Sequence, residues 1–415
     1  MSSSHNSSSL FSNCMFFARL GGVRILLWST LFGHSLCGIC SADDLASLQP
    51  PFYRSEKLFI AGDGGYHSFR IPSIVSTKSD VLIAFCEGRL DSNHDFGDID
   101  IVMKRSFDHG KKWNEIEKVI GIGTGVWGNP TSVYDAKTKT VFLFVSSNPE
   151  GYAQFGDQAK LVEDDGYEKI DEWGERRLWI LKSTNEGKTW SEPIDMSESL
   201  MPKSHVWDAV GPGQGIQKGR MPNRGRLIVP AIGRNIFSDD NGRTWHMELL
   251  PSGSSESTVV EKKSGNLMRN DRATGSNKLF KRRVVSHQAS GRHWSQFAPD
   301  MELLGPVSHA SILRYTFDPS RILFINTASE SVRRNLTLRM SYDEGASWTV
   351  ERKLDLFDGN PERHGGYTSL IKTGDNRVGL LYEYNEDVSD KSGGRSIVFT
   401  KLNLGWLLER FGRQN

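Results

Sequence analysis

Four arginines are the residues of this chain whose type and settings best suit chemistry. Each lies at the start or end of a short apolar or turn-rich run. Taken singly, each could be a surface or salt-bridged arginine, because arginine is rarely buried without an anionic partner. If they converge on one pocket, they require an anion, and a planar carboxylate matches the guanidinium fork. These residues are Arg70, Arg89, Arg272 and Arg333.

A repeated phrase indicates the elements that would bring such residues together. Ser, then Asp or Asn, then Gly, then Trp recur at the same spacing over 106–113, 183–190, 238–245 and 341–348, with a degenerate copy at 286–294. Asp and Asn favour turns, Gly supplies a positive φ, and Trp can cover a core. Counting the degenerate copy, the phrase recurs about every 50 residues, the period of a four-stranded propeller blade.

The intervening sequence is typical of a β protein. Short apolar runs bounded by turn residues predict strands at 81–85, 141–145, 227–230 and 322–325. The polar stretch 148–177 breaks this rhythm and predicts a long hairpin or insertion, and 402–410 predicts a short terminal helix. With 415 residues, no linker and a net charge of +1, we expect one closed domain over 43–415 that no overall field steers to nucleic acid or a membrane.

Residues 1–42 have the layout of a secretory signal peptide. Arg19 and Arg24 precede an apolar stretch that ends in small residues, although a Ser-rich leader is the alternative. We therefore expect a secreted, periplasmic or lumenal protein without a stable membrane span after the leader is removed. Three of the four cysteines lie in this segment, so only Cys86 would remain and no internal disulfide is possible.

Three further motifs accompany the repeats. They are Phe69-Arg70-Ile71-Pro72, Gly211-Pro212-Gly213-Gln214-Gly215-Ile216 and Leu381-Tyr382-Glu383. Together with the repeats, which correspond to Asp boxes, they resemble the sialidase (exo-α-neuraminidase) family of the bacterial and animal type, from about residue 58 to residue 401. The resemblance implies an all-β fold, a six-bladed β-propeller of four-stranded antiparallel sheets.

The resemblance also implies an arginine triad for a substrate carboxylate. Arg70 matches its first member, and Glu383 would orient Arg70. The second matches Arg272, which follows Glu256 by 16 positions in an Asn-x-Arg setting, with Arg269 as the competitor. The third matches Arg333, with its neighbour Arg334 as the alternative.

The catalytic residues follow from the same resemblance. Asp95, six residues beyond Arg89, matches the acid, with Asp91 and Asp98 as rivals. Glu87 and Arg89 would belong to the substrate-binding set, and Glu261 is expected to be a solvated strand residue rather than a rival base. Tyr367, in Gly366-Tyr367-Thr368, matches the nucleophile, and Glu256 matches its activating carboxylate. Tyr382 and Tyr384 are expected to be strand packing.

These residue types suit the removal of a terminal α-linked sialic acid from glycoproteins, gangliosides or oligosaccharides. Sialidases are an exception among retaining glycosidases because their nucleophile is tyrosine. A second carboxylate would be repelled by the one on the anomeric carbon, whereas a neutral phenol would not be, but a phenol needs a base. We expect no metal or other cofactor, since no His/Cys cluster has ligand spacing.

Other functions remain open at this point. The chain could be a trans-sialidase or an anhydro-forming enzyme, or it could prefer a deaminated sialic acid. It could also be a non-catalytic propeller, because Asp boxes occur in binding proteins that lack the arginines. The stretch 148–177 is a candidate for shaping linkage preference.

Overall fold

The computed structural model describes residues 50–155, 166–289, 293–354, 359–390 and 392–409. Contacts divide the chain into two units, Met1–Ser41 and Ala42–Asn415. The predicted leader over 1–42 lies outside the described residues and stays a prediction. The described residues all belong to the second unit.

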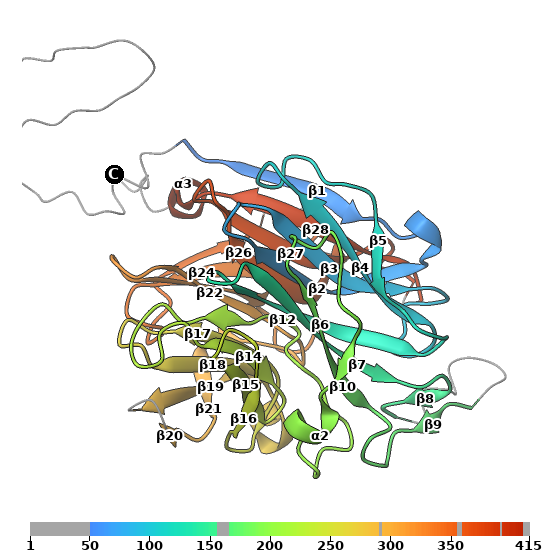
Figure 1. Cartoon of the computed structure of the whole chain (residues 1–415). Helices are drawn as coiled ribbons and strands as arrows, with labels where there is room; N and C mark the ends of the chain where they lie inside the picture. Colours follow the sequence, from blue (N-terminus) through green and yellow to red (C-terminus); the bar gives the residue numbers. More distant parts are fainter. Residues whose placement is uncertain (1–49, 156–165, 290–292, 355–358, 391, 410–415) are drawn as a thin grey trace, which may run out of the picture. The chain divides into compact units, whose positions relative to one another are not determined.

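The second unit is an all-β propeller of small, mainly antiparallel sheets (Figure 1). Three sheets have four strands each. In spatial order they are β1 (Tyr53–Phe59), β28 (Arg395–Leu402), β27 (Val378–Asn385) and β26 (His364–Lys372); β13 (Ile216–Gln217), β14 (Leu227–Ala231), β15 (Arg234–Ser238) and β16 (His246–Leu249); and β22 (Ser311–Thr316), β23 (Arg321–Thr327), β24 (Leu336–Ser341) and β25 (Val350–Lys353).

Two further sheets are larger. One has five strands: β17 (Ser254–Glu261), β18 (Leu267–Ala273), β19 (Arg282–Ala289), β20 (His293–Trp294) and β21 (Ala298–Leu304). The other has nine: β2 (Ser68–Ser76), β3 (Leu82–Arg89), β4 (Ile99–Ser106), β5 (Glu117–Ile120), β6 (Val126–Asp135), β7 (Thr140–Asn148), β10 (Arg177–Ser183), β11 (Ile194–Asp195) and β12 (Gly213–Gln214).

Among the described residues, the hydrogen-bonded strands do not form six separate four-stranded sheets, so that expectation is wrong. The physical reason is one parallel pair, Ile99 with Val126, which joins β4 to β6 and so merges two groups of strands into a single sheet. The four strands predicted at 81–85, 141–145, 227–230 and 322–325 are confirmed as parts of β3, β7, β14 and β23.

The stretch 148–177 holds a short parallel pair, β8 (Tyr152–Ala153) with β9 (Glu168–Lys169), rather than a hairpin. The remaining elements are short. They are α2 (Ser197–Leu200), α3 (Leu404–Leu408), and the 3-10 turns η1 (Asp63–Gly65), η3 (Gly275–Phe280) and η4 (Pro361–Arg363). The predicted terminal helix is confirmed as α3, and the Asn403 side chain caps it by accepting from the backbone N–H of Trp406 at 2.9 Å.

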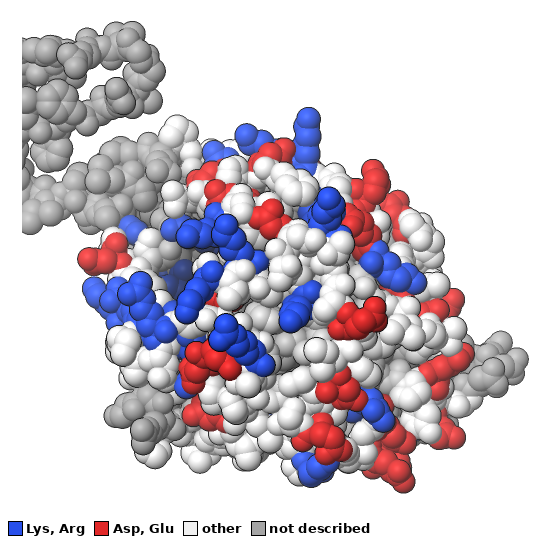
Figure 2. Space-filling view, viewed as in Figure 1, with Lys and Arg blue, Asp and Glu red and all other residues white. Residues whose placement is uncertain are grey.

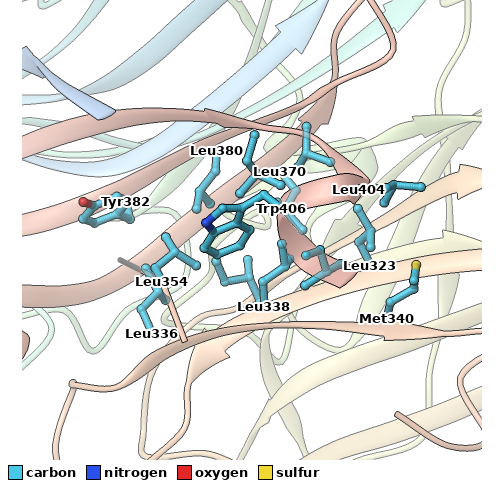
Figure 3. Close-up of a cluster of buried hydrophobic side chains, with 14 of the residues drawn as sticks. Leu323, Leu336, Leu338, Met340, Leu354, Leu370, Leu380, Tyr382, Leu404 and Trp406 are labelled. Atoms are coloured by element: carbon cyan, nitrogen blue, oxygen red, sulfur yellow. The ribbon is translucent and has the colours of Figure 1, made fainter. Parts of the chain in front are cut away.

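The core lies between neighbouring sheets. Figure 3 shows one such cluster, in which Trp406 and Leu404 of α3 pack against Leu380 and Leu370 of the last sheet and Leu338 of β24. Each fully buried side chain of this size contributes about 1.5–3 kcal/mol to folding. Tyr382 and Tyr384 belong to this cluster, so their prediction as strand packing is confirmed. Cys86 is likewise buried in β3 and forms no disulfide among the described residues.

All four Asp boxes occupy the same place, the turn between the last two strands of a sheet or half-sheet, as β15–β16 and β24–β25 show. In each box the serine hydroxyl accepts from the glycine N–H and the Asp or Asn accepts from later N–H groups, as Ser238, Asp240 and Gly242 illustrate. The boxes therefore connect outer strands and leave the inner ends of the sheets to other residues.

The molecular surface has no single sign of charge on the face shown in Figure 2, where basic and acidic side chains intermingle. This mixture agrees with the net charge of +1. No helix in the part of the chain that the structure describes has the length and apolar character that a membrane crossing requires.

Candidate active site

Four of the predicted site residues lie near the starts of first strands or the ends of second strands. Arg70 is in β2, Glu256 in β17 and Tyr367 in β26, each within the first four residues of its strand, and Arg89 is the last residue of β3. In an antiparallel pair, the start of one strand lies beside the end of the next. The topology therefore brings residues far apart in the sequence to one mouth of the propeller.

A pocket of about 250 Å³ lies at this mouth, and most of the predicted residues line it directly. Arg70 and Glu383 are not in its lining but contact residues that are. The predicted residues that line the pocket are Glu87, Arg89, Asp95, Glu256, Arg272, Arg333 and Tyr367.

Glu383 holds Arg70 from behind the pocket. Its fully buried carboxylate accepts from Arg70 Nε at 3.1 Å and from the backbone N–H of Ile71 at 3.0 Å. Its other oxygen accepts from the backbone N–H of Tyr367 at 3.4 Å. Burial would raise the pKa of Glu383, but the charge of Arg70, together with the charges of Arg395 and Arg333, holds that pKa below its usual value. Glu383 thus remains a charged support that fixes two site residues at once.

Glu87 supports Arg89 in the same way. One oxygen of its buried carboxylate accepts from Arg89 Nε at 3.0 Å, and the other accepts from the backbone N–H of Asn129 at 2.9 Å. Glu87 therefore orients Arg89. The sequence predicted only that Glu87 belongs to the substrate-binding set, without separating direct binding from orientation of an arginine.

Tyr367 and Glu256 form a hydrogen-bonded pair at the floor of the pocket. The Tyr367 hydroxyl donates to Glu256 Oε1, while Arg272 Nη1 donates to Glu256 Oε2 at 2.8 Å and to the Tyr367 oxygen at 3.2 Å. Arg70 and Arg333 lie over the Tyr367 ring, with guanidinium carbons 5.4 and 5.2 Å from its centre. One cation therefore contacts the phenol oxygen, and two more lie over the phenol ring.

The proton of this pair resides on the tyrosine in the free enzyme. Burial, and then the charge of Glu256, raise the pKa of Tyr367 above its usual value. Burial would also raise the pKa of Glu256, but Arg272, together with His309 and the hydrogen bond from Tyr367, holds that pKa below its usual value. A neutral phenol thus lies in hydrogen-bonding contact with a charged carboxylate that can accept its proton.

Asp95 lies across the arginines. Its Oδ1 pairs with Arg70 Nη1 at 2.7 Å and with Arg89 Nη2 at 2.8 Å, and 63% of its side chain remains exposed to the pocket. The loss of hydration in the pocket would raise the pKa of Asp95, but the charges of Arg70 and Arg89 hold that pKa well below its usual range. Asp95 therefore places a carboxylate where these arginines could hold a ligand's carboxylate.

The structure separates the competing residues. Arg269 is fully buried and pairs with Asp271, away from the pocket, and Arg334 turns outward to Glu362 at 2.6 Å. Asp91 and Asp98 line a different, smaller pocket. These positions support Arg272, Arg333 and Asp95 as the site residues.

Glu261 also lies away from the site, at the end of β17, but the expectation that it is solvated is wrong. Its side chain is buried and accepts from the backbone N–H groups of Gly219 and Arg220 at 2.7 and 3.0 Å. These two bonds satisfy a carboxylate that the strand end buries between neighbouring sheets.

Arg176 is a pocket residue that the sequence did not indicate. It is 2% exposed, donates to the side chains of Asn148 and Asn129, and stacks 4.0 Å from the ring centre of Trp207. Its only sequence signal is its place in the stretch 148–177, which also supplies Phe155 to the pocket lining. That stretch therefore contributes directly to the pocket wall.

No group of three or more His, Cys, Asp or Glu side chains in the described ranges is arranged to hold a metal ion. The chemistry that the pocket can perform with its own residues is the binding of a carboxylate by arginines, nucleophilic attack by a phenol assisted by a carboxylate, and proton transfer by Asp95.

Comparisons with known proteins define the class. The family model described as a BNR repeat-like domain matches residues 80–381. The chain is 40% identical over 361 residues to an exo-alpha-sialidase of Aspergillus fumigatus, covering 83% of this chain and 86% of that protein. It is 37% identical over 391 residues to an exo-alpha-sialidase of Arthroderma benhamiae, covering 88% and 93%.

A solved structure agrees with these relatives. The Hadza microbial sialidase Hz136 superposes with a TM-score of 0.68 at 25% identity, over 85% of this chain and 69% of that one. The protein is thus a glycoside hydrolase built on a BNR-repeat propeller. Within that class, the chain belongs to the sialidase family.

Proposed function

We propose that this exo-α-sialidase releases terminal α-linked sialic acids with retention of configuration, with Tyr367 as nucleophile, Glu256 as its base and Asp95 as acid and base. The observation that carries the proposal is the Tyr367–Glu256 hydrogen bond in a pocket lined by arginines. Such a nucleophile and base in direct contact, with the base oriented by Arg272, is the arrangement that covalent catalysis requires.

Substrate binding begins with an exchange of carboxylates. The carboxylate of the sugar pairs with Arg70, Arg272 and Arg333, each of which can form directed hydrogen bonds to it. It displaces Asp95 from Arg70, and the added negative charge raises the pKa of Asp95. Asp95 can then carry a proton near the glycosidic oxygen, which it could not do while both arginines held it.

Two displacements follow. In the first, the Tyr367 oxygen attacks the anomeric carbon and its proton passes to Glu256, while the bond to the leaving oxygen breaks and Asp95 protonates that oxygen. In the second, water attacks the anomeric carbon and gives a proton to Asp95, and the departing Tyr367 oxygen recovers its proton from Glu256. Each proton and electron pair is accounted for, and two inversions give net retention.

The test is product analysis by NMR during hydrolysis of 3′- and 6′-sialyllactose. We expect the α-anomer of free sialic acid as the first product, followed by slow mutarotation to the β-anomer. The β-anomer as first product would overturn the proposed double displacement. An intramolecular anhydro sugar or transfer to lactose as the main product would replace hydrolysis by one of the other reactions considered above.

We also propose that the propeller has six blades, with the nine-stranded sheet counted as two. Two Asp boxes lie in that sheet, one after β4 and one after β10, as though each half were a blade. A buried cluster joins Ile83 and Phe85 of one half to Leu143 and Val145 of the other, so the halves face each other across a core. A crystal structure in which strands β2–β4 and β6–β10 form one continuous flat sheet would contradict this count.

Finally, we propose that the substrates are sialylated glycoconjugates outside the cytoplasm, as the predicted leader suggests. Expression of the full-length chain in a secreting host, followed by N-terminal sequencing of the protein in the medium, tests the location. A protein that starts near residue 43 agrees with export, and retention of the intact chain in the cells would contradict it.

A further inference from the structure

The loop that carries Asp95 is fixed at its base and at its start. The backbone N–H of Leu90 donates to Asp98 at 3.0 Å and closes the loop. Arg89 Nη1 donates to the backbone oxygens of Asn93 and His94, each at 2.6 Å, and the Asn93 side chain donates to Gly393 at 2.9 Å. These contacts hold the residues before Asp95, and a separate contact is needed on its other side.

Phe96 provides that contact. This ring, directly after Asp95, is 6% exposed and contacts two other rings. His94 stacks on it at 5.0 Å with an angle of 6° between the planes, and Tyr167 packs against it at 4.4 Å with an angle of 53°. Aromatic pairs at such distances contribute about 0.5–1.5 kcal/mol beyond the burial of their area.

Tyr167 belongs to the stretch between β7 and β10 and is held there by the backbone. The N–H of Glu168, the next residue, donates to Gly151 at 2.7 Å, and that of Ile170 donates to Ala153 at 2.9 Å. Ala153 and Ile170 are buried, so the backbone bonds of the β8–β9 pair lie in a packed part of the molecule. Tyr167 is therefore a fixed support rather than a passing contact.

The need for this support arises when substrate binds. Asp95 pairs with Arg70 and Arg89 in the free enzyme, and the proposed mechanism gives Arg70 to the substrate carboxylate. The direction of the Asp95 side chain then depends more heavily on its own backbone. The backbone on its far side is fixed by Phe96, which Tyr167 covers.

We propose that Tyr167 is a positioning residue that holds Asp95 at the leaving oxygen by packing on Phe96. This inference rests on the proposed role of Asp95 as the acid. It gives part of the stretch 148–177 a function, which is to hold the loop that carries Asp95 from outside that loop. We call this contact of Tyr167 with Phe96 the clamp. A loss of position of about 1 Å can cost about 100-fold in rate, so even a modest shift of the loop is measurable.

The test compares two substrates in the Tyr167→Ala enzyme. Sialyllactose has a poor leaving group that needs protonation, whereas a 4-nitrophenyl α-sialoside does not. We expect kcat/KM for sialyllactose to fall about tenfold or more, and kcat/KM for the aryl sialoside to change by less than about threefold. The ratio kcat/KM is used because it reports the first chemical step and excludes the second, in which Asp95 serves as base for both substrates.

Two control variants separate positioning from stability. Tyr167→Phe keeps the ring on Phe96, so its kcat/KM should lie within about twofold of the wild-type value for each of the two substrates. Tyr152→Ala removes the same type of side chain from β8, the strand that pairs with β9, and should not change the preference between the two substrates. A thermal unfolding curve for each variant shows whether the protein remains folded at the assay temperature.

Failure of this inference can be told apart from failure of the proposed mechanism. If Asp95→Ala impairs sialyllactose far more than the aryl sialoside but Tyr167→Ala impairs both equally or neither, the clamp is overturned and the mechanism stands. If Asp95→Ala itself shows no such preference, the proposed acid is wrong and the clamp falls with it.

Discussion

The Asp-box turns and the pocket differ in how their residues are brought together. Within a box, all the hydrogen bonds join residues two to four positions apart, and the glycine N–H to serine hydroxyl distance is 2.8–2.9 Å in all four. At the site, Tyr367 and Glu256 are 111 positions apart, and Arg70 and Glu383, which lie behind the pocket, are 313 apart. Local bonds form each box turn, whereas the site exists only when the sheets are assembled.

The boxes nevertheless take part in that assembly. Each box glycine has a positive φ and lies against a side chain of the preceding sheet or half-sheet, as Gly242 does with Phe142 and Gly110 with Phe399. A side chain at these positions would collide with that neighbour. Damage to a box should therefore lower stability, and damage to the pocket should lower activity, with little overlap between the two effects.

Removing the nucleophile should produce the largest effect. We expect Tyr367→Phe to lower kcat on an aryl sialoside by about 1,000-fold or more, because it deletes the phenol oxygen that is bonded to Glu256. Tyr382→Phe deletes the same atom from the adjacent strand and should leave kcat within about twofold. Activity of Tyr367→Phe within about tenfold of wild type would remove the tyrosine from the mechanism.

Two adjacent arginines give the next contrast. Arg333 lines the pocket, whereas Arg334 pairs with Glu362 at the surface. We expect Arg333→Ala to lower kcat/KM about 100-fold through the lost carboxylate contact, and Arg334→Ala to change it less than about twofold. Equal losses in the two variants, measured on the same aryl sialoside, would show that the assignment by geometry is mistaken.

A box variant should show the opposite pattern. We expect Gly242→Ala to lower the free energy of unfolding by about 2 kcal/mol or more, because it adds a clash with Phe142 to an unfavourable φ of 78°. Gly123→Ala is the matched control, since Gly123 has a φ of 75° but open space around it, and it should cost only about 1 kcal/mol. Denaturant curves give both values, while kcat/KM at 25 °C should be unchanged; a kinetic defect in Gly242→Ala would blur the division between the regions.

The pH dependence should show the smallest effect. Because Arg272 holds the pKa of Glu256 low, the carboxylate stays charged until the pH falls below the usual value of about 4.3, and the acidic limb of kcat/KM should lie below that pH. In Arg272→Gln, the strongest influence that lowers the pKa of Glu256 is removed while burial remains, so the limb should move upward in pH. Profiles of the aryl sialoside reaction between about pH 3 and 7 test this, with Arg334→Gln as control. An acidic limb of kcat/KM that does not move in Arg272→Gln would show that this limb does not report the ionisation of Glu256.

The same contrast explains how far the sequence could predict the molecule. The boxes, the four strand predictions and helix α3 depend on local sequence, and the structure bears them out. The pocket residues were identified through motif resemblance, and the structure brings Arg70, Asp95, Glu256 and Tyr367 into contact. Resemblance could do this because each motif lies at a defined end of a strand.

What the sequence could not predict depends on distant partners. Arg176 looks like any polar residue until Asn129 and Asn148 are placed beside it by other strands. The ion pairs of Asp95 with two arginines depend on the assembled mouth, and the merger of two sheets depends on one backbone pair between β4 and β6. None of these interactions leaves a local pattern.

The pairing of β1 with β28 has a consequence for how the enzyme is made. Tyr53 pairs with Leu402, and the backbone N–H of Phe52 donates to the side chain of Asn403 at 3.0 Å. The first strand, β1, therefore shares a sheet with the last strand, β28 (Figure 1). Residues up to about 402 must therefore have left the ribosome before this sheet can close. Since the same sheet supplies Tyr367 and Glu383, a growing polypeptide has no catalytic capacity until β28 has emerged and paired.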